Sequence, residues 1–417
     1  MHDIMGAEGG CKMDRKDLKR IRELAREQLE IANSPAMEAL AQAWTDLNDC
    51  KRMKPLITVE TDTFASEVIP PLMECTTEEG RKWEYMLLSN IVNHKYFGDD
   101  TFVPSYIPVH YGTYMKPFDI DVQVQKSSGL GHHFVSVLTD LETDFEKLKP
   151  SSMGLCPKED TQKQVDEIGE VLDGILPGKI EGQANYAVPT QNIVHIMSME
   201  DIYLAMYDTP DLFKEMMDRL TDDYCRYFDL LEQAGYILPT TSGQRLGQGT
   251  YCFTNDLPKE NVCRTNQIWG FMDAQETAGI SPAMFEEFVF PYYRKVFSRY
   301  GLLSYGCCEA VDPIWENCLS RVENLRKVSI SPWCNEDYMG EQLRGRKIVY
   351  HRKPSPNFLG VGENLDEDAL RKHIRKTLTA AKGCTLEFTQ RDVYTIHNDI
   401  GKVRRYVEII REECEQF

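Results

Sequence analysis

The sequence lacks long apolar runs, and it lacks an excess of basic residues. No run of about 18 apolar residues occurs, so we expect no membrane-spanning helix. The 47 Lys and Arg residues are outnumbered by 66 Asp and Glu residues, which leaves a formal net charge of −19. Binding to phosphate-rich partners needs a basic face, so the composition argues against nucleic acid or an anionic membrane as a main partner.

Targeting and cofactor signatures are also missing. The opening MHDIMGAEGG has no basic flank followed by an apolar segment, as a secretory signal would. The 13 cysteines are odd in number and irregularly spaced, which is typical of reduced thiols in the cytoplasm rather than of a disulfide framework. No G-x-G-x-x-G opens a helix after an early strand, so the sequence gives little support for dinucleotide binding.

What is present is an alternation of strands and helices behind a helical start. Amphipathic patterns predict helices in a segment 1–53, and 54–62 reads as a first strand. Later strands are predicted at 266–276, 302–309, 325–333, 346–356 and 384–392, with helices at 281–301, 312–322, 335–343 and 366–383 between them. This pattern indicates parallel βα units. We therefore expect an α/β chain in which 54–417 forms a (β/α)₈ barrel of the TIM type.

Barrels of this type carry reactive groups at the carboxyl ends of their strands. The predicted strand ends bring together acids that can act as proton donors, Asp273, Glu276 and Glu309. They also carry residues suited to substrate binding: Trp269 and Trp333 for an apolar pocket, Tyr305 at the mouth, and Lys353 for an anion. Burial of the aromatic residues in the core, and a solvated loop position for Lys353, remain open as the simpler interpretations.

The stretch SYGCCEAVDP (304–313) raises the question of a metal. Strand alternation places Tyr305, Cys307 and Glu309 on one side. A thiolate and a carboxylate can hold Zn²⁺ with a third donor from another strand, and Cys384 is our candidate for that donor. The alternative is that Cys307 and Cys308 are small buried residues and that Glu309 pairs with Arg352 or Lys353.

Much of 249–395 resembles the uroporphyrinogen decarboxylase-like superfamily of (β/α)₈ barrels. The matching stretches are GTYCFTNDLP (249–258), WGFMDAQETAGISPAMFEEFVFPYYRKVF (269–297), YGCCEAVDPIWENCLSRVENLRKVSISPW (305–333), RKPSP (352–356) and CTLEFTQRDVYT (384–395). The likeness is to a branch linked with corrinoid-dependent methyl transfer in anaerobes.

The resemblance implies a methyltransferase component that moves a methyl group from a small molecule, such as an aryl methyl ether, to a corrinoid carried by a partner protein. Methyltransferases of the superfamily bind zinc through His-x-Cys and a later Cys. Here Cys307 and Cys384 match the cysteines, whereas Tyr305 stands at the histidine position. With methyl on oxygen or nitrogen, an acid at this place would assist the leaving group.

Two rival functions remain open on the sequence alone. One is a decarboxylase of the same superfamily, although KPLITVETDTF lacks the paired arginines that grip porphyrinogen carboxylates. The other is a non-catalytic barrel that binds a corrinoid or a small ligand. The assembly state is open as well, with a homodimer as one arrangement.

Overall fold

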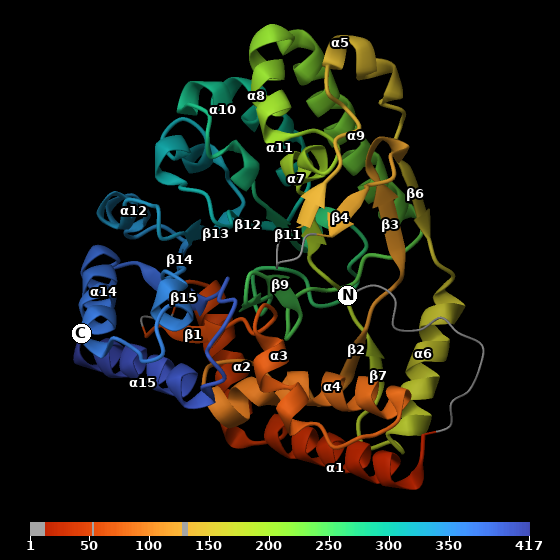
Figure 1. Ribbon diagram of the computed structural model, residues 1–417, viewed down its shortest axis with the longest axis vertical. Coiled ribbons are helices and arrows are strands. Elements are labelled where there is room, and N and C mark those ends of the chain that lie inside the picture. Colours follow the sequence, from red (N-terminus) through yellow and green to blue (C-terminus); the bar gives the residue numbers. More distant parts are fainter. Residues whose placement is uncertain (1–12, 52–53, 127–131) are drawn as a thin grey trace.

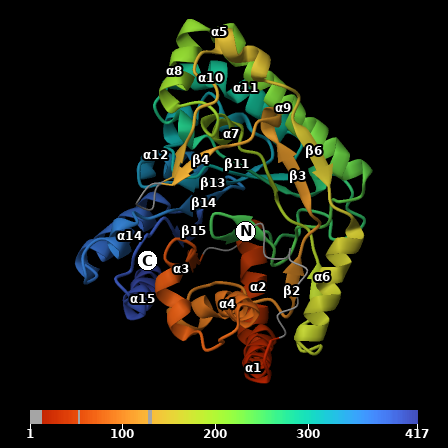
Figure 2. The ribbon, with the colours of Figure 1, turned by 45° about the vertical axis from the view of Figure 1, so that its right-hand side comes forward.

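The computed structural model describes residues 13–51, 54–126 and 132–417. A curved parallel sheet lies at its centre, with helices packed around the outer face (Figure 1). Turning the molecule by 45° shows the long helix α9 (Pro210–Gln233) running along the outside of the sheet (Figure 2). The α/β class and the parallel strands predicted from the sequence are confirmed. No helix of the described chain is long and apolar enough to cross a membrane.

Seven parallel strands form the main sheet in the order β1-β15-β14-β13-β12-β11-β8. Their bounds are β1 (Leu56–Val59), β8 (Asn185–Tyr186), β11 (Trp269–Met272), β12 (Leu302–Tyr305), β13 (Leu325–Ile330), β14 (Val349–Arg352) and β15 (Thr385–Gln390). Strands β11 to β15 are buried along their whole length, as expected when helices cover one face of a parallel sheet and a filled interior covers the other.

The sheet comes close to a barrel but is open on one side. Strand β2 (Ile107–Val109) pairs in parallel with β7 (Gly178–Ile180), which runs on within a few residues into β8. Among the described residues no ladder joins β1 to β2. Instead, the backbone N–H groups of Ile57 and Val59 donate to the carboxylates of Asp100 and Asp99, each at 2.8 Å. Side-chain oxygens thus satisfy the edge of β1, and the arrangement is compatible with a barrel without closing one.

The interior of the curved sheet is filled by a hairpin made of β9 (Arg245–Gly247) and β10 (Thr250–Tyr251). The hairpin needs glycine at position 247. Gly247 has φ 94°, and a Cβ there would overlap the hydroxyl of Tyr186. Lys327 of β13 donates from Nζ to Thr250 Oγ1 at 2.5 Å, and Thr58 of β1 donates to the carbonyl of Gly249 at 2.9 Å. The hairpin therefore contacts strands on both sides of the interior.

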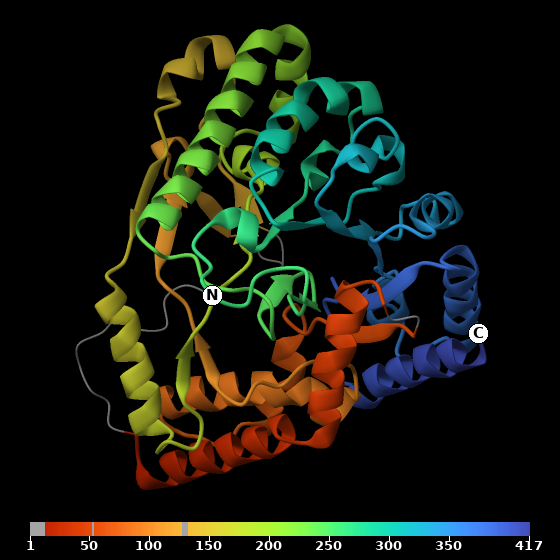
Figure 3. The same cartoon turned by 180° about the vertical axis from the view of Figure 1, so that it is seen from behind.

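Helices surround the sheet, as the view from behind shows (Figure 3). They are α1 (Arg15–Ala32), α2 (Pro35–Asn48), α3 (Ala65–Val68), α4 (Glu78–Val92), α5 (Leu141–Asp144), α6 (Lys158–Val171), α7 (Pro189–Val194), α8 (Met199–Asp208), α10 (Pro282–Phe288), α11 (Phe290–Phe297), α12 (Glu336–Leu343), α13 (Asn357–Gly360), α14 (Glu367–Ala380) and α15 (Ile400–Gln416). Four further short strands lie outside the sheet: β3 (Thr113–Lys116) pairs with β6 (Ser152–Leu155), and β4 (Val124–Lys126) pairs with β5 (His132–Phe134).

Two helix predictions need correction. The single helix expected over 281–301 is two helices, α10 and α11. Pro291 cannot donate a backbone hydrogen bond, so the chain ends one helix and begins another there. The helix expected over 312–322 is two short 3₁₀ turns, Asp312–Ile314 and Leu319–Arg321. Burial of Trp315 and Cys318 in the core outweighs the weak helix preference of this stretch.

The first helices are tied to the rest of the chain by buried polar contacts. The Asp17 carboxylate accepts from the N–H groups of Thr76 and Thr77, just before α4 begins. Asn48 Nδ2 donates to the carbonyls of Tyr251 and Phe253 at the base of the hairpin. Helices α1 and α2 thus support the hairpin and the open side of the sheet.

Candidate active site at the strand ends

Polar side chains gather where the parallel strands end. Asp273 and Glu276 follow β11, Cys307 to Glu309 follow β12, Lys353 follows β14, and Arg391 and Asp392 follow β15. All share one edge of the sheet because parallel strands end on the same side. The structure thus brings together most of the residues that the sequence predicted for the site.

A tight turn after β12 sets the position of Cys307. Gly306 adopts φ 97°, and a Cβ there would come within 3.1 Å of the Ser329 side chain, so glycine suits this turn. Glu309 fixes the turn from the other side. Its Oε2 accepts the N–H of Cys307 at 2.8 Å, and its Oε1 accepts the N–H of Ala274 at 3.1 Å. The Glu309 carboxylate therefore connects the turn after β12 to the loop after β11. In this geometry Glu309 is a positioning residue.

The thiol of Cys307 lies in a charged setting. Arg391 Nη1 donates to Cys307 Sγ at 3.3 Å, and the Cys308 Sγ lies 3.5 Å away. Contact with the Cys308 thiol, and then the positive charges of Lys353 and Arg391, lower the pKa of Cys307 to about 6 despite its burial. Cys307 is therefore a thiolate at neutral pH.

Cys308 is the other half of this pair and has a different environment. Its Sγ lies 3.2 Å from Asp392 Oδ2, to which it donates. The neighbouring Cys307 sulfur and burial raise the pKa of Cys308 above its usual range. The two adjacent cysteines are thus a thiolate and a thiol.

Lys353 is buried behind the thiolate. Its Nζ donates to the Cys307 carbonyl at 3.1 Å and to Gln248 Oε1 at 2.6 Å. Burial lowers the pKa of Lys353. Gln248 lies at the tip of the interior hairpin and has the left-handed φ of 55°, which is uncommon for a residue other than glycine. The hairpin tip is thus part of the site floor.

Glu276 lies at the end of a chain of three short contacts. Thr190 Oγ1 is 2.8 Å from Glu276 Oε2 and 2.8 Å from the Tyr293 hydroxyl, which in turn donates to the Asp273 carbonyl at 2.8 Å. Thr190 is the donor in its contact with Glu276, and the carboxyl oxygen accepts. Burial raises the pKa of Glu276.

Asp273 is the most strongly perturbed acid of the cluster. Its side chain is 3% exposed, and its Oδ1 has no hydrogen-bond partner in the described part of the chain. Burial, with the negative charges of Glu309, Cys307 and Glu276, raises the pKa of Asp273 to about 8. The hydroxyl of Tyr305, buried nearby at the end of β12, likewise lacks a partner among the residues described. Asp273 thus holds a proton at neutral pH.

A cavity of about 620 Å³ opens beside these acids. Glu276, Cys308 and Glu309 supply polar groups to its wall. The rest is mostly apolar and includes Met199, Ile280, Pro282, Phe285, Pro313, Ile314 and Trp333. Its size is in the usual range for small-molecule sites. Trp333, predicted to bind substrate, is 78% exposed at its rim.

Two residues predicted for the site lie elsewhere. Trp269 begins β11, is fully buried, and donates from Nε1 to the Cys252 carbonyl at 2.8 Å, so it is a core residue. Cys384 precedes β15, and its Sγ contacts the Gly340 carbonyl at 3.3 Å. The 6 residues of β15 lie between Cys384 and Arg391. At about 3.3 Å per residue, this strand is roughly 20 Å long. Cys384 is at the wrong end of its strand.

The predicted zinc site therefore does not fit. Cys307 and Cys384 lie toward opposite edges of the sheet, and both oxygens of Glu309 are held by backbone N–H groups. Within residues 13–51, 54–126 and 132–417, no three His, Cys, Asp or Glu side chains are grouped so as to hold a metal ion.

Four residues of the cluster were not among the predicted site residues: Glu60, Gln248, Arg391 and Asp392. Glu60 directly follows β1 and forms an ion pair with Arg391 Nε at 3.1 Å. Glu60, Arg391 and Asp392 all follow strand ends, so the rule that selected Asp273 could have selected them too. Gln248 gave no such signal, because its place depends on the hairpin entering the interior of the curved sheet.

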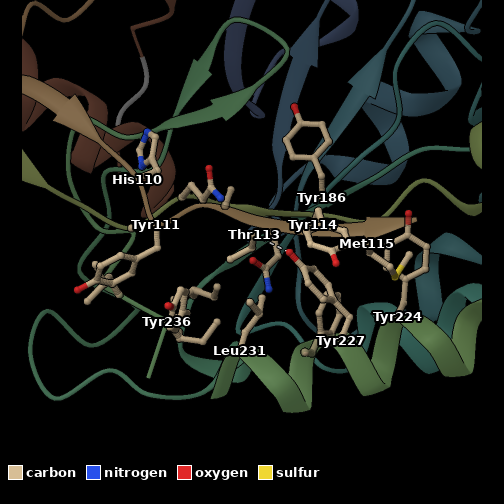
Figure 4. A pocket seen from close by; sticks show the side chains of 18 of the residues that line it. His110, Tyr111, Thr113, Tyr114, Met115, Tyr186, Tyr224, Tyr227, Leu231 and Tyr236 are labelled. Atoms are coloured by element: carbon tan, nitrogen blue, oxygen red, sulfur yellow. Dashed lines mark hydrogen bonds between the residues drawn. The ribbon is translucent and has the colours of Figure 1, made fainter. Parts of the chain in front are cut away.

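A second cavity, of about 420 Å³, lies between α9 and the segment around β3 and β8 (Figure 4). Tyrosines from several elements line it: Tyr111, Tyr114, Tyr224, Tyr227 and Tyr236. Tyr186 borders it, but its ring points away from the other labelled tyrosines (Figure 4). The residues that line this cavity do not include the acids Asp273 and Glu276 or the thiols Cys307 and Cys308. The strand ends therefore remain the better candidate site.

No protein-family model matches the chain, and no curated protein matches it by sequence. Among solved structures, a methyltransferase from Methanosarcina mazei is similar, with a TM-score of 0.50 and 13% sequence identity. The similarity covers 89% of this chain and 98% of that chain. At this identity the likeness concerns the fold, which extends over nearly all of both proteins.

Proposed function

We propose that this chain is the methyltransferase component of a corrinoid-dependent demethylation. In this proposal the fold is an open variant of the (β/α)₈ barrel of the uroporphyrinogen decarboxylase-like superfamily. The substrate is a small molecule with a methyl group on oxygen or nitrogen, such as an aryl methyl ether. The acceptor is a corrinoid held by a partner protein, which supplies a reduced cobalt nucleophile when it docks.

The observation that carries the proposal is the carboxyl group of Glu276, whose pKa is raised by burial, on the wall of an apolar cavity. Loss of a methyl group leaves negative charge on oxygen or nitrogen, and a proton delivered to that atom lowers the barrier. Thr190 Oγ1 donates to Glu276 Oε2 at 2.8 Å and holds the carboxyl group at the cavity wall. Asp273, protonated behind it, keeps a second negative charge away from the leaving group.

The cavity supports the same reaction by its shape and lining. Apolar walls exclude water from the atom that receives the proton, which strengthens the effect of the nearby acid. Trp333 stands exposed at the rim, where a partner or substrate ring could pack against it. The likeness in fold to a methyltransferase is consistent with this proposal.

A decarboxylase of the same superfamily is less well supported. Such an enzyme needs several arginines to hold carboxylates. At the described strand ends Arg391 is already engaged by Glu60, Asp392 and Cys307. The balance of charge around the cavity is acidic, which disfavours a polycarboxylate substrate.

The test is methyl transfer to free cob(I)alamin, followed by its absorbance change, with a panel of aryl methyl ethers and methylated amines. We expect turnover with one class of donor. Glu276→Gln should lower kcat by roughly a hundredfold, because a positioned general acid contributes on that order. Glu287→Gln, a surface change on α10, is the matched control. Absence of transfer with every donor, or full activity of Glu276→Gln, would contradict the proposal.

A further inference from the structure

The adjacent cysteines after β12 have an arrangement that the proposed methyl transfer does not use. Cys307 is held as a thiolate beside Arg391 Nη1, at 3.3 Å. Cys308 is a thiol whose hydrogen points to a carboxylate, Asp392 Oδ2, at 3.2 Å. The two sulfurs are 3.5 Å apart. A nucleophilic sulfur, a second thiol within reach and a base for its proton are thus present together.

We propose that Cys307 and Cys308 form a reversible redox pair that reacts with hydroperoxides. The inference goes beyond the proposed function and does not depend on it. The pair belongs to the site, because Cys308 lines the 620 Å³ cavity and Glu309, next in the chain, fixes the turn that carries both sulfurs.

The chemistry balances in two steps. The Cys307 thiolate attacks the outer oxygen of a hydroperoxide, the O–O bond breaks, and a sulfenic acid forms while the alkoxide or hydroxide leaves and takes up a proton. The Cys308 sulfur then attacks the sulfenic sulfur, forming the S–S bond and expelling hydroxide. Asp392 accepts the Cys308 proton and passes it to the departing hydroxide, which leaves as water. The hydroperoxide gains two electrons and the two sulfurs lose two.

Geometry makes the product easy to reduce. The chain has no cis peptide bond in its described part, so the two Cα atoms are about 3.8 Å apart. Ordinary disulfides span about 4.4–6.8 Å between Cα atoms, and shorter spans store strain. Strained disulfides are the labile ones. A bond between these residues would therefore be a reversible modification rather than a structural link.

Oxidation would also change the site. Bonding the Cys307 sulfur to its neighbour removes the negative charge that Arg391 and Lys353 face. The Arg391 guanidinium would then keep only its carboxylate partners, Glu60 and Asp392. The oxidised and reduced forms thus differ in charge at the centre of the strand-end cluster.

The experiment follows the mass of one tryptic peptide. Trypsin releases residues 300–321 as a single peptide that contains Cys307, Cys308 and Cys318. The intact reduced protein is treated with one equivalent of hydrogen peroxide, and free thiols are then blocked. We expect the peptide to lose two hydrogens, to lose two alkylation sites, and to regain both after dithiothreitol.

Variants separate the members of the pair. Cys318→Ala should keep the response, because Cys318 is buried in the core away from the turn. Cys308→Ser should instead yield a sulfenic acid that dimedone traps. Asp392→Asn should slow the loss of hydrogens at least about tenfold, because it removes the proton acceptor. Melting curves confirm that each variant is folded.

Two results would overturn the inference. One is a peptide that gains oxygen without a stage that has lost two hydrogens. The other is loss of two hydrogens that persists in Cys308→Ser, which would mean that Cys318 or another thiol is the partner. The readout is independent of methyl transfer, so failure here leaves the proposed function in place, and failure of methyl transfer leaves this result in place.

Discussion

Arg391 Nη1 donates to the sulfur of Cys307 across 3.3 Å, which joins the end of β15 to the turn after β12. The same guanidinium forms an ion pair with Glu60 at the end of β1. One cation therefore links three strand ends of an unclosed sheet and, with the Cys308 contact and Lys353, lowers the pKa of a thiol.

Removing that cation should make Cys307 a weaker acid. In Arg391→Gln the thiol loses both a hydrogen-bond donor and a nearby positive charge, so its pKa should rise from about 6 by roughly one unit or more. The measurement is the rate of alkylation of Cys307 by iodoacetamide as a function of pH. Arg404→Gln, which removes a surface arginine that contacts the Lys95 and Tyr96 carbonyls, is the control. An unchanged midpoint would show that Arg391 does not set this pKa.

Asp273 should make stability depend on pH. Its folded-state pKa of about 8 lies above the ordinary 3.8, so the folded protein keeps a proton that the unfolded chain releases. This contribution is fully present below about pH 4 and is lost as pH rises through 8, with a slope of up to about 1.4 kcal/mol per pH unit.

Asp273→Asn should therefore flatten the fall in the free energy of unfolding between pH 6 and 8, to be measured by urea unfolding at several pH values. Glu287→Gln should retain the wild-type slope. A variant that keeps the full slope would place the retained proton on another group.

Trp333 should matter for binding and not for stability. Because its side chain is 78% exposed, Trp333→Ala removes little buried surface, and Tm should move by no more than about 1 °C. KM for substrate or for cob(I)alamin should rise several-fold with kcat little changed, since the indole lies at the rim and not among the acids. Phe417→Ala, an exposed aromatic at the end of α15, is the comparison. A fall in kcat alone would argue against a binding role.

The interior ion pair of Lys327 and Glu387 should show the cost of an unpaired buried charge. The two side chains are fully buried with Nζ 2.5 Å from Oε2. Lys327→Met should destabilise the fold by about 3–5 kcal/mol because it leaves Glu387 without its partner. The double variant Lys327→Met with Glu387→Leu should recover much of that loss. Urea unfolding of the four proteins gives the coupling energy, and simple additivity would contradict the prediction.

The strand-end rule predicted most of the site because it uses only local information. A residue that directly follows a buried apolar strand must lie at the carboxyl edge of a parallel sheet, which holds for Asp273 and Cys307. The same rule excludes Cys384, which follows Gly383 and precedes its strand. The zinc prediction gave the number of sulfur donors more weight than their positions along the strands.

Other features were out of reach of the sequence. The position of the Glu276 carboxyl group depends on Thr190, which is distant in the chain and meets it only in the folded state. The edge of β1 is satisfied by Asp99 and Asp100, and nothing in their local pattern distinguishes such carboxylates from surface acids. Long-range packing decides both.

The hairpin at 245–251 contributes Gln248 to the strand-end cluster, and it is a different segment from the strands that carry the acids and thiols. In a barrel whose interior is filled by strand side chains, altering the depth of the pocket disturbs the sheet itself. Here Gln248, at the tip, can be exchanged while the seven strands of the main sheet keep their hydrogen bonds, whereas Gly247 and Gly249 are fixed by close contacts with Tyr186 and Thr389. The surroundings of Lys353 can therefore change through a single tip residue, without redesign of the scaffold that holds the acids and thiols.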